Sequence, residues 1–462
     1  MQKVEKGVSL SVVTLSWPIF IEIFLQMLVG NIDQFMMSHY SQEAVAAVAN
    51  ANQIMNIFIM LIIVMSTAST ILIAQFRGAK QTESLNEVGT VSVAFNLVFS
   101  FTAACLIWLF HETFFHWLGV PEDIFAETSL YMNIVAVSIP ITGVYTAFVA
   151  MFRGYSLPVI SMMVAFVMNV IHIISNAILI YGWGPIPSMG VFGVSMSTTL
   201  SKAVGLIIIY WLFKTQLPLR LSWQYIWPFP KRMLKALLRI GVPSGGETLS
   251  YQLSQTTIMM MVNLLGLVVI NTKVYVYIIA MFCYMYTIAL ANAAQIVVGF
   301  LVGANREEEI SQRVWQTVGT GLCVSVGLTG IFYVFSDSVL GLFTTDPDML
   351  ALGHTILGIE MVLEIGRSVN IVMVQCLQAA GDIRTPMLVG VFGMWLCAVT
   401  LSYVFGLQLG WGLVGIWWAM AIDEGVRALI FVWRWQSGKW KNRKLIANVR
   451  CTMKRPSLKY IE

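Results

Sequence analysis

The chain has 462 residues, of which 58% are hydrophobic and only 11% are charged. Soluble domains carry about 25% charged residues, so this chain lacks the charge needed to cover a water-facing surface of its size. The mean hydropathy of +0.78 agrees, and the net charge of +4 is too small to indicate a particular partner by itself.

The apolar runs, taken in chain order, predict an all-α integral membrane protein with twelve transmembrane helices. A helix needs about 20 apolar residues to cross the bilayer, so a dozen spans with short loops leave no room for a large soluble domain. The runs end at segments rich in Gly, Pro and charge, such as RGAKQTES and GWGPIPSMG. The predicted spans are 11–38, 46–75, 88–110, 125–152, 158–181, 190–213, 236–265, 271–302, 314–335, 350–378, 386–408 and 412–434.

The distribution of lysine and arginine predicts the orientation. Apart from Lys202, Lys273, Arg367 and Arg427, all of these residues fall in alternate connections or at the two termini. Because cytoplasmic loops carry the excess of basic residues, both termini are predicted to be cytoplasmic, in the inner cell membrane. The basic connections are 75–88, 153–158, 214–239, 303–313 and 379–385, whereas 39–45, 111–124, 182–189, 336–349 and 409–411 hold no Lys or Arg.

An internal repeat divides the chain into two halves of six spans each. The proline and glutamate of SWPIFIE recur in GVPSGGE, and AQFRGAK aligns with GFLVGAN at the same offset along the chain. An even number of spans makes these parallel repeats, which predicts a substrate site near the midplane between the halves. The predicted units are an N-terminal bundle (1–213), a cytoplasmic linker (214–235), a C-terminal bundle (236–435) and a basic cytoplasmic tail (436–462). The tail is interpreted as an anchor on anionic lipid rather than a nucleic-acid arm, so no nucleic-acid partner is expected.

Ionisable groups inside spans are costly unless they face a cavity or a partner, so their positions indicate a polar site. At about 100° per residue, the polar residues of the first span lie on one stripe. Those of the fifth span share one face, and those of the sixth share another. At a rise of about 1.5 Å per residue, an outer cluster and a deeper pair are predicted. The outer cluster is Asp33, Asn176 and Thr198, with His172 on the same face as Asn176; the deeper pair is Glu22 and Lys202, with Gln26 on the Glu22 stripe.

The second half carries a different set of polar residues. Glu364–Arg367 and Asp423–Arg427 are spaced to pair within their own helices. The position equivalent to Asp33 is Ile258, so the first half is predicted to handle the ion. The residues predicted to line the substrate cavity are Glu22, Gln26, Lys202, Glu247, Tyr251, Gln255, Glu364 and Arg367.

The run NIDQFMMSHYSQEAVAAVANANQI, the two repeats and MGVFGVSMSTTL after the fifth span resemble the multidrug and toxic compound extrusion (MATE) transporters of bacteria. The resemblance covers the chain from roughly Leu10 to Trp435. It implies two pseudo-symmetric six-helix bundles arranged as a V, no cofactor, and a monomer. It also implies export of small cationic, amphipathic drugs by alternating access, as antiport against protons or sodium ions.

The family's first-helix aspartate falls on Asp33, and its N-lobe cation site extends to the positions of Asn176, His172 and Thr198. Some members have a second carboxylate at the position of Asn176, so the substitution argues against a tight sodium site. The nearby Lys202 argues against a bound metal cation as well.

In the second half, the family's seventh-helix glutamate falls on Tyr251, with Glu247 one turn earlier as a substitute. The tenth-helix aspartate of the sodium-coupled branch falls on Arg367, which argues against a C-lobe sodium site. Proton coupling is therefore the first expectation and sodium coupling the second.

Two other functions remain as alternatives. A flippase for lipid-linked sugars, from the same superfamily, predicts a more cationic cavity, whereas the charges inside these spans are mostly acidic. An integral-membrane enzyme predicts a metal or nucleophile cluster, yet the five histidines do not cluster on one helix at ligand spacing. ATP-driven pumping predicts GxxxxGK[ST], which the sequence lacks. The protein is therefore not expected to be an enzyme.

Overall fold

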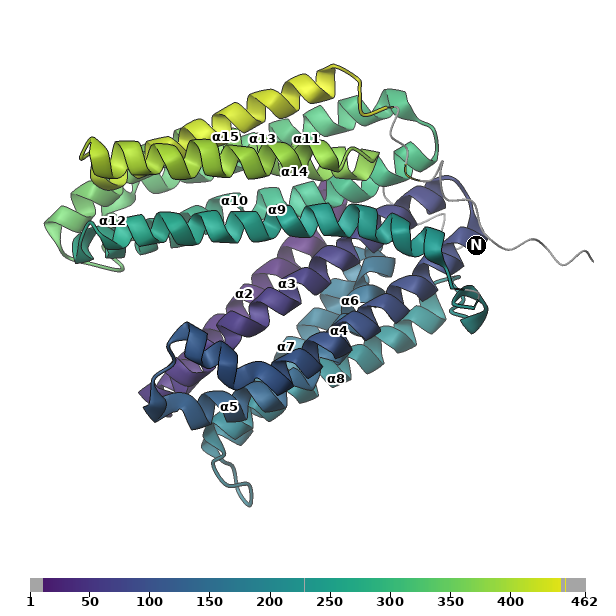
Figure 1. Cartoon of the computed structure of the whole chain (residues 1–462), viewed down its shortest axis with the longest axis horizontal. Helices are drawn as coiled ribbons and strands as arrows, with labels where there is room; N and C mark the ends of the chain where they lie inside the picture. Colours follow the sequence, from purple (N-terminus) through teal and green to yellow (C-terminus); the bar gives the residue numbers. More distant parts are fainter. Residues whose placement is uncertain (1–10, 228, 442–444, 446–462) are drawn as a thin grey trace, which may run out of the picture.

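The computed structural model describes residues 11–227, 229–441 and 445, and its helices form two lobes that diverge as a V (Figure 1). The predicted fold class, an all-α membrane protein of two repeated bundles, is confirmed. The first lobe holds α2 (Val12–Ser38), α3 (Gln42–Gly78), α4 (Thr82–Leu118), α5 (Glu122–Ala136), α6 (Ser138–Gly154), α7 (Pro158–Tyr181) and α8 (Gly190–Gln216).

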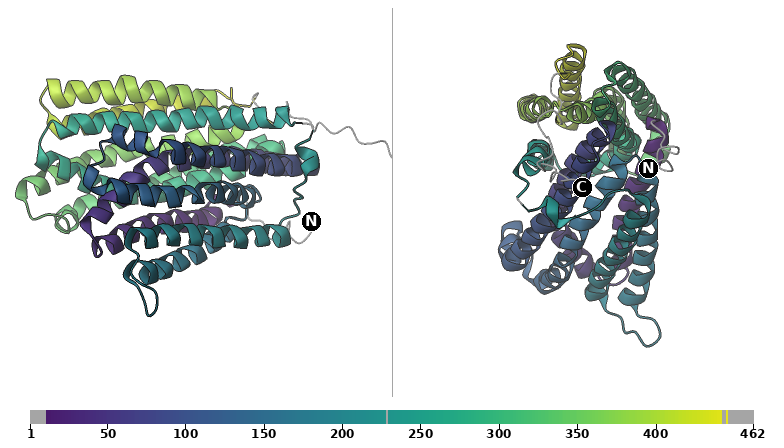
Figure 2. Two further views of the ribbon diagram at one scale, coloured as in Figure 1. Left: turned by 60° about the horizontal axis from the view of Figure 1, so that its bottom comes forward. Right: turned by 90° about the vertical axis from the view of Figure 1, so that its right-hand side faces the viewer.

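The second lobe follows a connection that contains the short helix η1 (Trp223–Tyr225). Figure 2 shows the helices running along the molecule in its left view and, in its right view, the molecule from the end at which the lobes converge. The second lobe consists of α9 (Lys231–Asn263), α10 (Leu267–Gly303), α11 (Glu307–Val334), α12 (Ser336–Leu340), α13 (Pro347–Ala380), α14 (Arg384–Gly393), η2 (Met394–Val399), η3 (Ser402–Gln408) and α15 (Gly412–Gln436).

Ten of the twelve predicted spans are apolar enough to cross a membrane by composition. Within the described ranges, nine helices pass this test singly, and α5 with α6 pass together as a bent pair. The remaining two, α9 and α15, fail because polar or charged residues occupy their middle turns, including Asp423, Glu424 and Arg427 of α15. These two helices therefore contribute polar side chains to the interior of the second lobe.

Two predicted spans are not regular helices. The span predicted at 125–152 bends by 42° between α5 and α6. Pro140 explains the break, because its ring clashes with the carbonyl four residues earlier, at Ala136, where α5 ends. The span predicted at 386–408 starts as α14 and continues through the π-helical turns of η2 and η3. Such wide turns occur often at functional sites.

The first helices of the two lobes exchange hydrophobic partners. Val12 and Leu15 of α2 pack in the core of the second lobe, with residues of α10, α11 and α13. The repeat-equivalent positions, Leu237 and Ile240 of α9, pack in a core of the first lobe. Each lobe is therefore tied to the other by the inner half of its own first helix, while the outer halves stay in their own lobe.

The lobes approach most closely where α3 crosses α10. A Cβ placed on Gly78 would lie 2.0 Å from the carbonyl oxygen of Phe300, and one on Gly303 would lie 1.9 Å from that of Gln75. The internal repeat relates the two contacts: Gly78 and Gly303 occupy equivalent positions, and each packs against the backbone of the other lobe at equivalent positions. Only glycine permits this distance between backbones. The side-chain amide of Gln75 also donates to the carbonyl of Ala379 at 2.7 Å.

The end at which the lobes converge carries the basic connections. The turns after α3, α6, α10 and α13 all lie there, next to Arg77, Arg153, Arg306 and Arg384. The V opens at the other end, where α12 and the Lys- and Arg-free connection 182–189 lie. Most of the predicted basic tail (442–444 and 446–462) and the first ten residues lie outside the described residues.

We expect Gly78→Ala and Gly303→Ala each to destabilise the protein by about 1–3 kcal/mol, because the added carbon would overlap backbone of the other lobe. The measurement is thermal unfolding of the purified protein in detergent. The matched control is Gly319→Ala in α11, where an added Cβ meets nothing within 4 Å. Unchanged unfolding midpoints for both Gly78→Ala and Gly303→Ala would contradict the close crossing.

Candidate functional site

Three of the four residues predicted to bind the ion meet in the first lobe. The carboxylate of Asp33, on α2, accepts a hydrogen bond of 2.6 Å from the amide of Asn176, on α7. The same oxygen, Oδ1, lies 2.8 Å from Nε2 of His172, which is one turn earlier on α7. Asn176 and His172 are buried, whereas the side chain of Asp33 keeps 17% exposure. The polar residues of each of these two spans share one helix face, and the two faces pack against each other. This packing brings Asp33, His172 and Asn176 together.

The contact between Asp33 and His172 requires a proton. A carboxylate oxygen and an unprotonated ring nitrogen are both acceptors, so they would repel each other at 2.8 Å. The hydrogen must lie either on Nε2 or on the carboxyl group. Nδ1, the other ring nitrogen, lies 3.2 Å from the hydroxyl of Ser201, which can donate or accept and so fits either tautomer. The geometry thus describes a carboxyl group and an imidazole ring that share one hydrogen atom.

Thr198, the fourth predicted ion-site residue, does not bond to Asp33. Its hydroxyl donates to the carbonyl of Val194 in its own helix at 2.8 Å. Instead, Thr198 interacts with Tyr131 of α5, whose phenol donates to Asn52 at 3.1 Å and lies within electrostatic reach of Asp33. Tyr131 was not predicted as a site residue, because the sequence of the fourth span does not indicate which of its faces points to Asp33.

The predicted pair of Glu22 and Lys202 is wrong. Glu22 forms an ion pair of 2.9 Å with Arg153, at the end of α6, and accepts a hydrogen bond of 3.1 Å from Ser161. Lys202 instead donates to the hydroxyl of Ser138 at 3.3 Å. Equal depth along two helices does not specify which faces meet. Arg153 was counted among the basic residues that indicate the orientation, because it borders a connection between spans. In the structure its side chain points into the first lobe and pairs with Glu22.

A cavity of about 440 Å³ lies between the lobes. The first lobe contributes Val64 and Thr67 of α3, and the remaining wall belongs to the second lobe. Three residues predicted for the substrate cavity line it, namely Glu247, Tyr251 and Arg367. Glu424 and Arg427 of α15 add charge, and Tyr277 and Tyr284 of α10 add aromatic surface.

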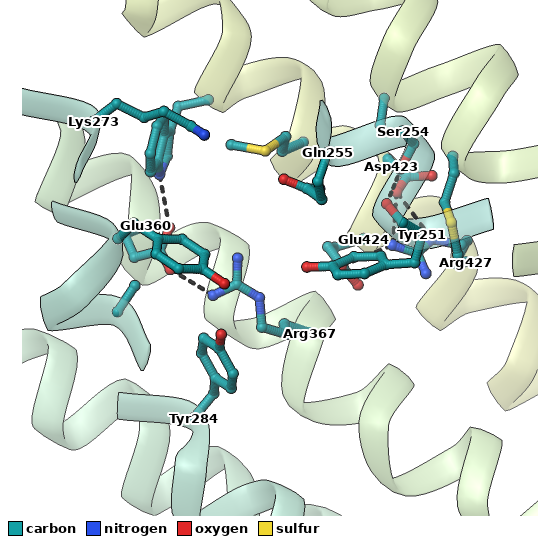
Figure 3. A pocket seen from close by; sticks show the side chains of 16 residues that line it. Tyr251, Ser254, Gln255, Lys273, Tyr284, Glu360, Arg367, Asp423, Glu424 and Arg427 are labelled. Carbon is teal, nitrogen blue, oxygen red and sulfur yellow. Dashed lines mark hydrogen bonds and ion pairs between the residues drawn. The ribbon is translucent and has the colours of Figure 1, made fainter. Parts of the chain in front are cut away.

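A smaller pocket of about 30 Å³ adjoins this cavity inside the second lobe (Figure 3). It shares Tyr251, Arg367 and Arg427 with the larger cavity and adds Gln255 and Lys273. Of the other residues predicted to line the substrate cavity, Glu364 sits behind Arg367, while Glu22, Gln26 and Lys202 line neither of the two spaces.

The two arginines that line the cavity, Arg367 and Arg427, are held by two carboxylates each. Arg367 pairs with Glu364, as the spacing predicted, and also with Glu360 at 2.6 Å. The Arg367 guanidinium also lies over the ring of Tyr284, 4.9 Å from its centroid. The indole nitrogen of Trp417 donates to the other oxygen of Glu360 at 2.7 Å. The pair of Arg367 with Glu360 is drawn as a dashed line in Figure 3, and the two carboxylates leave Arg367 in an acidic surrounding.

Arg427 repeats this pattern on α15. It pairs with Asp423 at 2.7 Å, as predicted, and with Glu424 at 2.8 Å. Glu424 also accepts a hydrogen bond of 2.5 Å from Asn370 of α13. Neither arginine is therefore available to an anionic ligand without first leaving its carboxylates.

Glu247 differs from these carboxylates because it has no cationic partner in an ion pair among the described residues. Its carboxylate accepts a long hydrogen bond of 3.4 Å from the amide of Gln378. It packs on Gly390, where a Cβ would lie 3.1 Å from Oε1 of Glu247. Arg427 lies within electrostatic reach but is bound to its own two carboxylates.

The repeat explains why Glu247 is unpaired. Glu247 is the repeat equivalent of Glu22, and Gln378 stands at the same offset from Arg153. The two lobes therefore form a contact between the same repeat positions, but the residue that faces the glutamate is charged in one lobe and neutral in the other. In the first lobe it is an ion pair of 2.9 Å. In the second it is a carboxylate beside a neutral amide, and both of these residues line the cavity.

The MatE family model matches residues 18–178 and 243–404, two segments that begin at the equivalent prolines of the two repeats. The chain belongs to the MATE family. Members of this family are membrane transporters and not enzymes, so this chain is a multi-pass transporter of the cell membrane.

Two relatives and one solved structure show the extent of the similarity. "Uncharacterized transporter YisQ" of Bacillus subtilis is 33% identical over 93% of this chain and 94% of its own length. "Probable multidrug resistance protein NorM" of Thermotoga maritima is 23% identical over 95% and 94% of the two chains. A structure described as an "Outward-facing conformation of a multidrug resistance MATE family transporter of the MOP superfamily" superimposes with a TM-score of 0.86, at 21% identity, over 95% of this chain and 98% of that one.

In this MATE transporter, Arg153→Met is expected to cost about 3–5 kcal/mol of stability, because it leaves the buried carboxylate of Glu22 without its counter-charge. The double variant Glu22→Gln/Arg153→Met is expected to recover most of that loss. Chemical or thermal unfolding of the purified variants measures both. If Lys202→Met cost as much as Arg153→Met, the pairing of Glu22 would be with Lys202 after all.

Proposed function

We propose that this MATE transporter exports small cationic, amphipathic compounds in exchange for protons, with sodium as the second candidate ion. The observation that carries the proposal is an unpaired carboxylate, Glu247, on the wall of a cavity between the two lobes. A relative named as a probable multidrug resistance protein, NorM of Thermotoga maritima, supports the choice of cargo.

The cavity suits a cation with an apolar body. Glu247 supplies negative charge that no arginine or lysine neutralises through an ion pair within the described chain. The rings of Tyr251, Tyr277 and Tyr284 supply flat surfaces on which cations and aromatic groups bind well. A lipid-linked sugar would present an anionic phosphate, and both arginines of the cavity are already held by two carboxylates each. The cation exporter is therefore favoured over the flippase.

The ion site of the proposal is the group formed by Asp33, His172 and Asn176. A proton between Asp33 and His172 satisfies the observed contact of 2.8 Å, whereas a sodium ion prefers oxygen ligands and would have to displace the imidazole. Proton uptake at this pair would neutralise Asp33 and change the hydrogen bonds that join α2 to α7. The inner half of α2 packs in the second lobe, so this helix connects the proposed ion site with the interface between the lobes.

Alternating access would require the lobes to separate at the crossing of α3 and α10. The lobes are in contact at the end with the basic connections, which the charge distribution assigns to the cytoplasm. With that orientation both termini are cytoplasmic, and this structure is open to the outside. Opening to the cytoplasm would separate the backbone contacts at Gly78 and Gly303 while the outer ends of the lobes approach each other, within a single monomer.

Transport by the purified protein in lipid vesicles tests the proposal, with a pH gradient and a sodium gradient applied separately. We expect the pH gradient alone to drive uptake of tetraphenylphosphonium. Asp33→Asn is expected to lower this uptake at least tenfold, about 1.4 kcal/mol or more, yet to leave equilibrium binding of the cation intact.

The matched control is Asp348→Asn, an exposed carboxylate in the first turn of α13. It should transport at the wild-type rate. Uptake driven by sodium alone would contradict proton coupling, and normal pH-driven uptake by Asp33→Asn would contradict the role of Asp33.

A further inference from the structure

An open groove of about 820 Å³ lies at the converged end of the second lobe, away from the transport cavity. It is formed where α9 and α14 begin and where the connection between the lobes ends. Its lining combines basic and apolar side chains and contains no acidic one: Phe229, Lys231, Leu234, Lys235, Leu238, Arg239 and Arg384.

The basic side chains of the groove converge from two helices. Lys231, Lys235 and Arg239 are spaced four residues apart, so they share one face over the first turns of α9. Arg384 opens α14, which packs against α9. All four are exposed, and none forms an ion pair with a described residue. Four exposed cations that converge without a counter-charge make this groove attractive to an anion.

The apolar side chains indicate what kind of anion fits. Leu234 and Leu238 lie one turn apart between the lysines and are half-buried, and Phe229 is 58% exposed. The neighbouring connection carries Trp223 and Trp227, which are 83% and 85% exposed. Exposed tryptophan is typical of the membrane–water interface. A soluble anion would use the positive charges and leave the apolar strip uncovered.

We propose that this groove binds an anionic phospholipid of the cytoplasmic leaflet. The phosphate group lies among Lys231, Lys235 and Arg384, at the level of the headgroups, and an acyl chain covers Leu234 and Leu238. Arg239, about 12 Å further along the helix, extends its side chain back toward the phosphate. Because α9 directly follows the connection between the lobes, the bound lipid holds the start of the second lobe at the membrane surface.

Lipid binding to the full-length protein in detergent tests this proposal. Native mass spectrometry and the thermal unfolding midpoint are measured with added phosphatidylglycerol, with zwitterionic phosphatidylethanolamine, and with inorganic phosphate. We expect retention of phosphatidylglycerol and a raised midpoint with that lipid alone. Lys231→Gln/Lys235→Gln is expected to weaken phosphatidylglycerol binding about 30-fold, because each basic residue near an anionic surface contributes about fivefold.

The matched control removes the same charge at the same end of the molecule. Arg220→Gln/Arg232→Gln changes two exposed arginines that do not line the groove, and it should bind phosphatidylglycerol as the wild type does. Equal weakening in the two double variants would show a diffuse charge effect and overturn the site. A midpoint raised equally by inorganic phosphate would overturn the lipid in favour of a soluble anion.

Discussion

The contact of backbone with backbone at Gly78 and Gly303 is the constraint on which the rest of the architecture depends. A carbon added at Gly78 would lie 2.0 Å from a carbonyl oxygen of the other lobe, and one at Gly303 would lie 1.9 Å from another, so the lobes are joined at one end and diverge from it. The divergence creates the cavity between them. The exchange of core partners by α2 and α9 adds a second tie, and it makes the first helix of each lobe sensitive to the position of the other lobe.

The partner of each buried carboxylate distinguishes those that stabilise the fold from those that are available for transport. An ion inside the bilayer is tolerated only with a partner or in a wet cavity. Asp33 meets a histidine and an amide, and Glu247 meets only an amide within the part of the chain described. In the function proposed above, a proton occupies the first of these sites and a cationic cargo the second. Within the predicted spans, the carboxylates that pair with an arginine instead are Glu22, Glu360, Glu364, Asp423 and Glu424.

Much of this arrangement could be predicted from the sequence because helical periodicity and charge placement are local properties. The twelve spans and the grouping of Asp33 with Asn176 follow from them, whereas the family resemblance added His172 to the ion site. The pairing of side chains between helices is not a local property. Equal depth in the membrane predicted an ion pair of Glu22 with Lys202, whereas the helix faces that pack together bring Glu22 to Arg153. The bend at Pro140 could have been predicted from proline chemistry. The groove of Lys231 and Arg384 could not, because residues far apart in the chain share it only after the second lobe has packed.

The charge at residue 378 provides the most direct test, because a glutamine stands there in the place that arginine holds in the first lobe. Equilibrium binding of tetraphenylphosphonium to the purified protein measures its effect. Gln378→Arg should neutralise Glu247 and weaken binding about tenfold or more, while Gln378→Leu should stay within about twofold of the wild type. Wild-type affinity in the Gln378→Arg protein would contradict the claim that an unpaired Glu247 binds the cation.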